Sequence, residues 1–125
     1  MWINNGKNFT TEWKFIKVFD KYVRFNSELS ETLKLDEYKY CHIEELGDDK
    51  YGDFAFHFCK ERRPESTPYS SKSELHTSAI RIACKYVAMS LSNKLGNKCI
   101  VPIEYTKNDN EVVVTTMWRM NNGIL

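Results

Sequence analysis

A short helix followed by a pair of strands is indicated twice along this chain, and this repetition limits the folds open to it. The first copy runs from Ser27 to Phe58 and the second from Ser73 to Met117. In each copy a polar turn separates two stretches that alternate apolar and polar residues. One helix with one hairpin is too small to bury its own apolar face. We therefore expect the two units to share a single core.

The length and composition favour one globular domain, residues 1–125, in a reducing compartment. The chain has 125 residues, of which 42% are hydrophobic and 14% aromatic, which suffices for one core without disulfides or metal. No apolar run approaches the ~18 residues of a membrane span, and the polar N-terminus lacks a secretory signal pattern. The four cysteines are widely spaced, without a CxxC pair. We therefore predict a cytoplasmic protein with free thiols and no membrane contact.

Alternation and capping signals predict an α+β fold in the order β-β-α-β-β-α-β-β. Residues 12–25 alternate bulky apolar and basic side chains, which indicates a pair of strands. Capping residues then precede a short helix over residues 28–35. The apolar residues between 73 and 95 indicate one long, largely buried helix with Glu74 and Arg81 on its narrow exposed strip. The predicted fold is thus a compact domain of antiparallel hairpins around this helix.

The hairpins and the connection between the two units complete this prediction. In the hairpin over residues 38–59, the apolar side chains fall on one face if Ile43 lies opposite Phe54. The basic, Pro- and Ser-rich stretch 60–71 is predicted to be an exposed loop. In the last hairpin Pro102 has no backbone N–H to donate, so its strand is expected at a sheet edge or at a bulge.

A basic-apolar strand end, a short apolar helix and a Leu-x-Leu motif follow one another within residues 23–43. These features are carried by Arg24, Phe25, Leu29, Leu33, Leu35 and Ile43. The order resembles the core of AbrB-like swapped-hairpin DNA-binding domains, although Asn26 stands where the family has proline and Tyr38-Lys39 where it has Gly-Asp. The resemblance implies an intertwined homodimer that grips DNA from a basic strand face, with Arg24 as the motif-matched contact.

Basic side chains on the N-terminal strand pair provide the first candidate binding surface. Cations spaced along strands can neutralise successive phosphates and release counterions. Because the net charge is only +1, nucleic-acid binding requires a local patch. The alternative interpretation is that these cations keep the strands soluble and discourage edge pairing. The predicted contacts are Lys14, Lys17, Lys21 and Arg24, extended from the loop by Arg62, Arg63 and Lys72.

The polar face of the first hairpin provides a second candidate surface. Tyr38 and Tyr40, beside His57, can stack on unpaired bases or dock a protein partner. The alternative interpretation is that they are ordinary half-buried strand aromatics. A partner face here, or an open sheet edge, supports a second function, that of a protein-interaction or inhibitor module.

No residue pattern indicates catalysis, a metal or a cofactor. A P-loop, a dinucleotide fingerprint, a Ser-His-Asp arrangement and HExxH are absent from the sequence. His42, His57 and Cys59 lack a fourth ligand for zinc, and the carboxylates of residues 44–53 lack the glycine spacing of a calcium loop. The sequence therefore predicts a small, non-catalytic DNA-binding regulator that forms a homodimer, with the protein-interaction module as the alternative. An enzyme that uses the histidine and cysteine positions is the third hypothesis.

Overall fold

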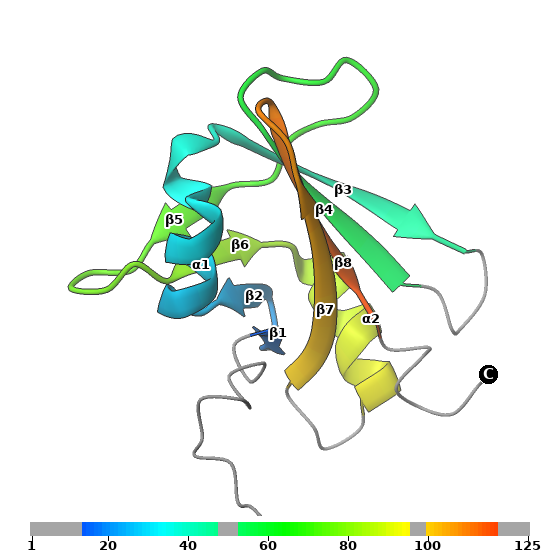
Figure 1. Ribbon diagram of the computed structural model, residues 1–125. Helices are drawn as coiled ribbons and strands as arrows, with labels where there is room; N and C mark the ends of the chain where they lie inside the picture. Colours follow the sequence, from blue (N-terminus) through cyan, green and yellow to red (C-terminus); the bar gives the residue numbers. More distant parts are fainter. Residues whose placement is uncertain (1–13, 48–52, 96–99, 118–125) are drawn as a thin grey trace, which may run out of the picture.

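The computed structural model describes residues 14–47, 53–95 and 100–117, and most of them lie in antiparallel strands (Figure 1). Helix α1 spans Ser27–Leu33, the 3-10 turn η2 spans Leu35–Glu37, and α2 spans Lys85–Leu95. The strands are β1 (Phe15–Val18), β2 (Tyr22–Phe25), β3 (Tyr40–Leu46), β4 (Asp53–Cys59), β5 (Ser71–Ser73), β6 (Ile80–Ala83), β7 (Ile100–Lys107) and β8 (Glu111–Thr116).

The strands form one curved sheet in the order β3-β4-β8-β7-β1-β2-β6-β5. Strand β7 joins its two halves, because its first residues pair with β1 and its later residues pair with β8. The two edges of the sheet meet where the amide of Tyr69, just before β5, donates to the carbonyl of Cys41 in β3 at 2.7 Å. The sheet is therefore a nearly closed barrel.

The interior of the barrel is filled by alternate strand side chains and by α1. On β1 and β2 every second residue is buried, as the two-residue period of a strand requires. Phe25 of β2 contacts Phe56 and Phe58 of β4 edge to face, with ring centroids 5.4 and 5.2 Å apart. Leu29 and Leu33 of α1 belong to the same buried cluster. One core therefore connects the N-terminal strand pair, α1 and the first predicted hairpin.

The predicted N-terminal strand pair and the short helix after it are confirmed as β1–β2 and α1. The side-chain oxygen of Asn26 accepts the Leu29 amide at 2.8 Å and so caps the helix. Ser30 is buried within α1, and its hydroxyl donates to the Phe25 carbonyl at 3.1 Å. These two bonds fix α1 to the end of β2.

The predicted long helix over residues 73–95 is wrong. Strands β5 and β6 occupy the first part of this stretch, and α2 begins only at Lys85. Apolar residues crowded at 79–83 fit a helical stripe, but their burial alternates, with Ile80 and Ile82 inside. Branched isoleucines favour a strand, and β6 completes a ladder with β2. The fold is therefore a mainly antiparallel barrel with two short helices in the described residues, and the predicted α+β class is corrected.

Both predicted hairpins are present, as β3–β4 and β7–β8, and the register of the first differs from the predicted one. Ile43 lies opposite Phe56 instead of Phe54. A shift of two residues keeps every apolar side chain on the same face, so alternation alone cannot exclude it. Pro102 is not on an edge strand, because β7 runs between β1 and β8. Its missing N–H is tolerated since the β7–β8 ladder starts at Ile103.

Candidate nucleic-acid interface

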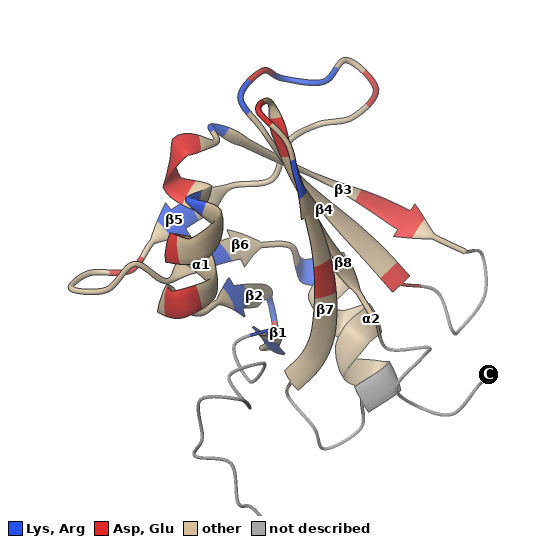
Figure 2. Ribbon diagram, in the orientation of Figure 1, with Lys and Arg blue, Asp and Glu red and all other residues tan. Residues whose placement is uncertain are grey.

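Four basic side chains from four adjacent strands stand in one line across the outer face of the barrel. Lys17 of β1 lies opposite Arg24 of β2. Arg81 of β6 lies between Arg24 and Lys72 of β5 and pairs directly with both. Directly opposed residues share a face of the sheet, so we call these four residues the cationic row. Figure 2 shows basic segments on each of the four strands. At ~4.8 Å between strands the row spans about 14 Å.

One acidic side chain, Glu74, lies between the two arginines of the row. Its carboxylate accepts hydrogen bonds from Arg24 Nε at 2.8 Å and from Arg81 Nε at 2.8 Å. These two bonds, that from Arg24 first, lower the pKa of Glu74 to about 2. The same contacts raise the pKa of both guanidinium groups. Glu74 is therefore ionised at neutral pH and cancels one of the four positive charges of the row.

Aromatic rings lie beside the cationic row. Phe19 and Tyr22 stack at 4.6 Å with an interplanar angle of 15°. The guanidinium of Arg81 lies over the Tyr22 ring at 4.9 Å, within the range of a cation–π contact. This stack fixes the position of Arg81 on the outer face, although half of its side chain remains exposed, at 50%.

Two of the predicted basic contacts, Lys14 and Lys21, lie outside the row. Lys14 precedes β1 and lines a cavity of about 440 Å³ along β7 and β8. Lys21 lies in the exposed turn between β1 and β2, where its carbonyl accepts the Cys84 amide at 3.2 Å. The sequence-predicted patch is therefore only partly brought together, at Lys17, Arg24 and Lys72.

The loop cation Arg63 belongs to a separate network, and Arg62 precedes it in the same loop with its side chain exposed. Residues 60–70, most of the predicted loop, connect β4 to β5 and are mostly exposed. Arg63 Nη1 donates to Glu111 of β8 at 3.0 Å, and Arg63 Nη2 donates to Glu65 at 3.3 Å. Arg63 therefore carries ion pairs of its own and does not extend the row.

His42 attaches this loop to the sheet. It is 2% exposed, and its Nε2 accepts the backbone N–H of Arg63 at 3.1 Å. The neutral ring then carries its proton on Nδ1, which donates to Ser66 Oγ at 2.6 Å. Burial, followed by the charges of Arg63 and Arg62, lowers the pKa of the ring. Because Ser66 accepts the histidine proton, this pair does not activate the serine as a nucleophile.

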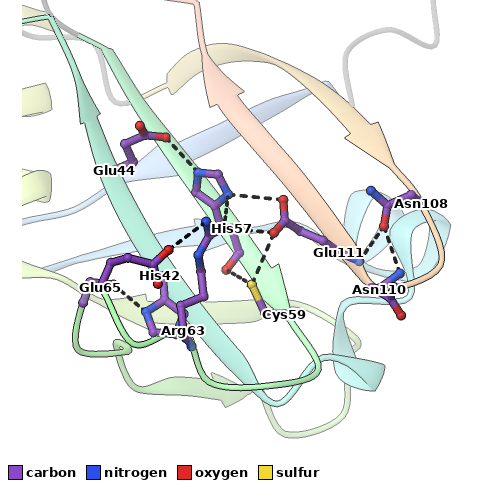
Figure 3. Close-up of polar contacts among 10 residues, drawn as sticks. His42, Glu44, His57, Cys59, Arg63, Glu65, Asn108, Asn110 and Glu111 are labelled. Carbon is purple, nitrogen blue, oxygen red and sulfur yellow. Dashed lines mark hydrogen bonds and ion pairs between the residues drawn. The ribbon is translucent and has the colours of Figure 1, made fainter.

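His57 is the direct cross-strand partner of His42 and lies between two carboxylates (Figure 3). Its Nε2 is 3.0 Å from Glu44 Oε1, and its Nδ1 is 3.4 Å from Glu111 Oε1. Arg63 Nη1 also approaches Nδ1 at 3.4 Å. Both ring nitrogens of His57 therefore contact charged groups of the chain itself.

The two tyrosines predicted beside His57 lie in different surroundings. Tyr38 is 7% exposed and belongs to the buried core, whereas Tyr40 is half-buried with its ring 6.5 Å from that of His42. The expectation that Tyr38 shares an exposed face with Tyr40 and His57 is therefore corrected. Strand β3 begins only at Tyr40, and Tyr38 follows η2, so strand alternation does not govern its direction.

The cysteines and histidines of the described residues form no metal centre. No group of three or more His, Cys, Asp or Glu side chains in this part of the chain is placed to hold a metal ion. Cys41, Cys59 and Cys84 are buried free thiols. Burial raises the pKa of Cys84 to about 12, and burial also raises that of Cys41. These thiols are therefore protonated at neutral pH and weak nucleophiles.

No protein-family model, curated protein or solved structure matches the chain. The AbrB-like resemblance of residues 23–43 therefore stays a prediction. Within that segment, its motif-matched contact Arg24 is paired with Glu74 in the cationic row. In the described part of the chain, neither helix has the length and apolar character needed to cross a membrane.

Sequence reasoning misses Arg81 and Glu74 as site residues because it assigns both to the exposed strip of a long helix. The signal that could have placed Arg81 is the run Ile80-Arg81-Ile82, in which a cation stands between two branched apolar residues. No local signal could have placed Glu74, since its contact with Arg24 spans 50 positions of the sequence.

Proposed function

We propose that the chain is a small, non-catalytic nucleic-acid-binding protein that contacts the sugar–phosphate backbone through the cationic row. The single observation that carries this proposal is the strand register, which lines up Lys17, Arg24, Arg81 and Lys72 across four adjacent strands. A line of cations about 14 Å long can meet successive phosphates of one strand. The regulatory role and the homodimer implied by the AbrB-like resemblance, and a cytoplasmic location, belong to the same proposal.

Local charge on the outer face supports this proposal despite the net charge of +1. The row holds four cations and one carboxylate, that of Glu74, which leaves the row a net charge of +3. The acidic residues of α1 and η2 lie on other elements than the strands of the row, as Figure 2 shows. Two of them, Glu31 and Asp36, line a pocket together with Ser73 of β5 and Thr77, so they also contribute to the field beside the row.

Removing the two ends of the row should weaken nucleic-acid binding. We expect the variant Lys17→Gln/Lys72→Gln to bind a fluorescein-labelled oligonucleotide about tenfold more weakly at low salt, because two phosphate contacts are lost. For the unmodified protein we expect a slope of about −2 to −3 in a plot of log K against log salt concentration. The variant should lower the magnitude of this slope by about 2. Fluorescence anisotropy across a salt series measures both quantities.

The matched control is Lys39→Gln/Lys85→Gln, which removes the same charge at two exposed lysines outside the row. Single-stranded DNA, duplex DNA and single-stranded RNA are compared in parallel, because backbone contacts alone do not choose among them. Equal loss of affinity in both double variants would show that net charge, and not the row, governs binding. Millimolar affinity of the unmodified protein for all three ligands would refute the proposal.

The second candidate, a protein-interaction module, is favoured by a different surface from the one predicted. On α2, Tyr86 is 63% exposed and Met89 is 49% exposed. These residues are three positions apart and therefore neighbours on the helix surface. Aromatic and methionine side chains are enriched at protein interfaces. This candidate replaces the first only if the salt series detects no nucleic-acid binding.

A further inference from the structure

Four donor groups converge on the carboxylate of Glu74. Arg24 binds it with two nitrogens, Nε to Oε2 at 2.8 Å and Nη2 to Oε1 at 3.1 Å. Arg81 Nε donates to Oε2 at 2.8 Å, and Thr77 Oγ1 donates to Oε1 at 3.3 Å. The Glu74 side chain is only 14% exposed among these groups. The arrangement is a cradle for an oxyanion, occupied by a carboxylate of the chain itself.

The strand pairing that places the two arginines side by side does not involve Glu74. They are directly paired residues of β2 and β6, in the middle of the row. Arg81 is also held by its contact with the Tyr22 ring. Two guanidinium groups this close repel each other unless an anion lies between them. Because the strands hold Arg24 and Arg81 side by side, the position between their guanidinium groups favours an anion.

Glu74, in contrast, lies on the exposed connection between β5 and β6. Leu75 beside it is 85% exposed, and His76 has a left-handed φ of 68°. Its neighbour in this connection, Thr77, adds the hydroxyl donor. The carboxylate is thus delivered by a surface turn, whereas the cations that bind it belong to the barrel wall.

We propose that the Arg24–Arg81 pair is a phosphate-binding site, and that Glu74 occupies it as an internal competitor until a phosphodiester of the bound nucleic acid takes its place. This inference rests on the proposed function. A planar guanidinium binds phosphate with the same paired donors that it offers to a carboxylate. A phosphodiester and a carboxylate each carry one negative charge, so the exchange leaves the charge of the site unchanged. The competitor is tethered, so its effective concentration is high, and it weakens the ligand's access to both arginines.

Replacing the competitor should therefore strengthen binding. We expect Glu74→Gln to bind the labelled oligonucleotide about tenfold more tightly at low salt, with a salt slope steeper by roughly 1 to 2, because two cations become available to phosphates. Glutamine keeps the length of the side chain and an oxygen that accepts from one donor. Fluorescence anisotropy gives the affinity, and thermal denaturation verifies that the variant is folded.

Two further variants separate the site from a general charge effect. Glu65→Gln makes the same charge change at an exposed residue paired with Arg63, outside the row, and should leave affinity within about twofold. Adding Arg24→Gln to Glu74→Gln should remove most of the gain. An equal gain in Glu65→Gln, or a gain that survives loss of Arg24, would overturn the inference.

The inference and the proposed function fail in different ways. If Lys17→Gln/Lys72→Gln weakens binding but Glu74→Gln leaves it unchanged, the row binds nucleic acid and the competitor is refuted. If a folded Glu74→Gln protein and the unmodified protein both show no binding, the proposed function is refuted and the inference with it. If Glu74→Gln is unfolded, Glu74→Ala repeats the test without any side-chain acceptor, with the same gain expected in a folded protein.

Discussion

Phe25→Ala is expected to lower the free energy of unfolding by about 3–5 kcal/mol. Phe25 is fully buried, and its ring meets Phe56 and Phe58 edge to face at 5.4 and 5.2 Å. It lies at the end of β2, so removal of its ring leaves a cavity between the strand pair β1–β2 and the hairpin β3–β4. Urea denaturation monitored by circular dichroism measures the change, with an unchanged m-value expected for a purely native-state effect.

Leu75→Ala serves as the control for this substitution. Leu75 is 85% exposed on the β5–β6 connection, so we expect its truncation to change the free energy of unfolding by no more than about 0.5 kcal/mol. A loss below about 1.5 kcal/mol for Phe25→Ala would contradict the packing described for the barrel interior. It would mean that the site collapses around the missing ring at little cost.

The elements whose signals are local could be predicted from the sequence. The alternation in β1 and β2 and the cap at Asn26 depend on residues close together in the chain, and the structure has them where the pattern places them. The face of β3 and β4 that is buried was also predictable. Their register was not, because pairing Ile43 with Phe54 or with Phe56 buries the same side chains. The choice between the two registers depends on the geometry of the turn.

The pairings that build the candidate site are non-local and therefore outside the reach of pattern reasoning. The row depends on β2 pairing with β6 and on β6 pairing with β5. Because Ile80 and Ile82 were predicted to lie in a helix, Arg81 between them was not expected in the sheet. Its position next to Arg24 was therefore not predicted. The basic character of the loop also grouped Arg62 and Arg63 with the strand cations, although Arg63 pairs with Glu111 and Glu65 away from the row. Two basic segments of a sequence need not lie close together in the fold.

His42→Ala is expected to lower the free energy of unfolding by about 2–3 kcal/mol at pH 7.5, because it removes a buried ring and leaves the Arg63 amide without its acceptor. The size of this loss should depend on pH. Native His42 must keep Nε2 unprotonated, and burial, then the charges of Arg63 and Arg62, lowers its pKa. The unfolded chain titrates near 6.5 and so binds a proton that the native state excludes.

This difference in proton binding fixes the sign of the pH effect. The contribution of His42 is fully present above the unfolded pKa and is lost as the pH falls below about 6.5 toward the native pKa, by at most about 1.4 kcal/mol per pH unit. The alanine variant lacks this ring, so its free energy of unfolding does not contain this pH-dependent contribution. The difference between the unmodified protein and His42→Ala should therefore shrink between pH 7.5 and pH 5.5. Glu74, with a pKa of about 2, stays ionised throughout this range.

Urea denaturation at pH 7.5, 6.5 and 5.5 tests this, with His42→Gln as the matched variant, since a glutamine oxygen can accept the Arg63 amide without titrating. We expect His42→Gln to be more stable than His42→Ala at every pH and to lack the histidine-dependent slope. His76→Asn is the control, because it removes an exposed histidine at a φ of 68°, which asparagine tolerates. This variant should keep the pH dependence of stability that the unmodified protein shows.

Protonated His42 would lie beside Arg62, Arg63 and His57, with Glu65 as the one opposing charge among these neighbours. Parallel pH profiles for the unmodified protein and His42→Gln would therefore show that the loop is attached by contacts other than this ring.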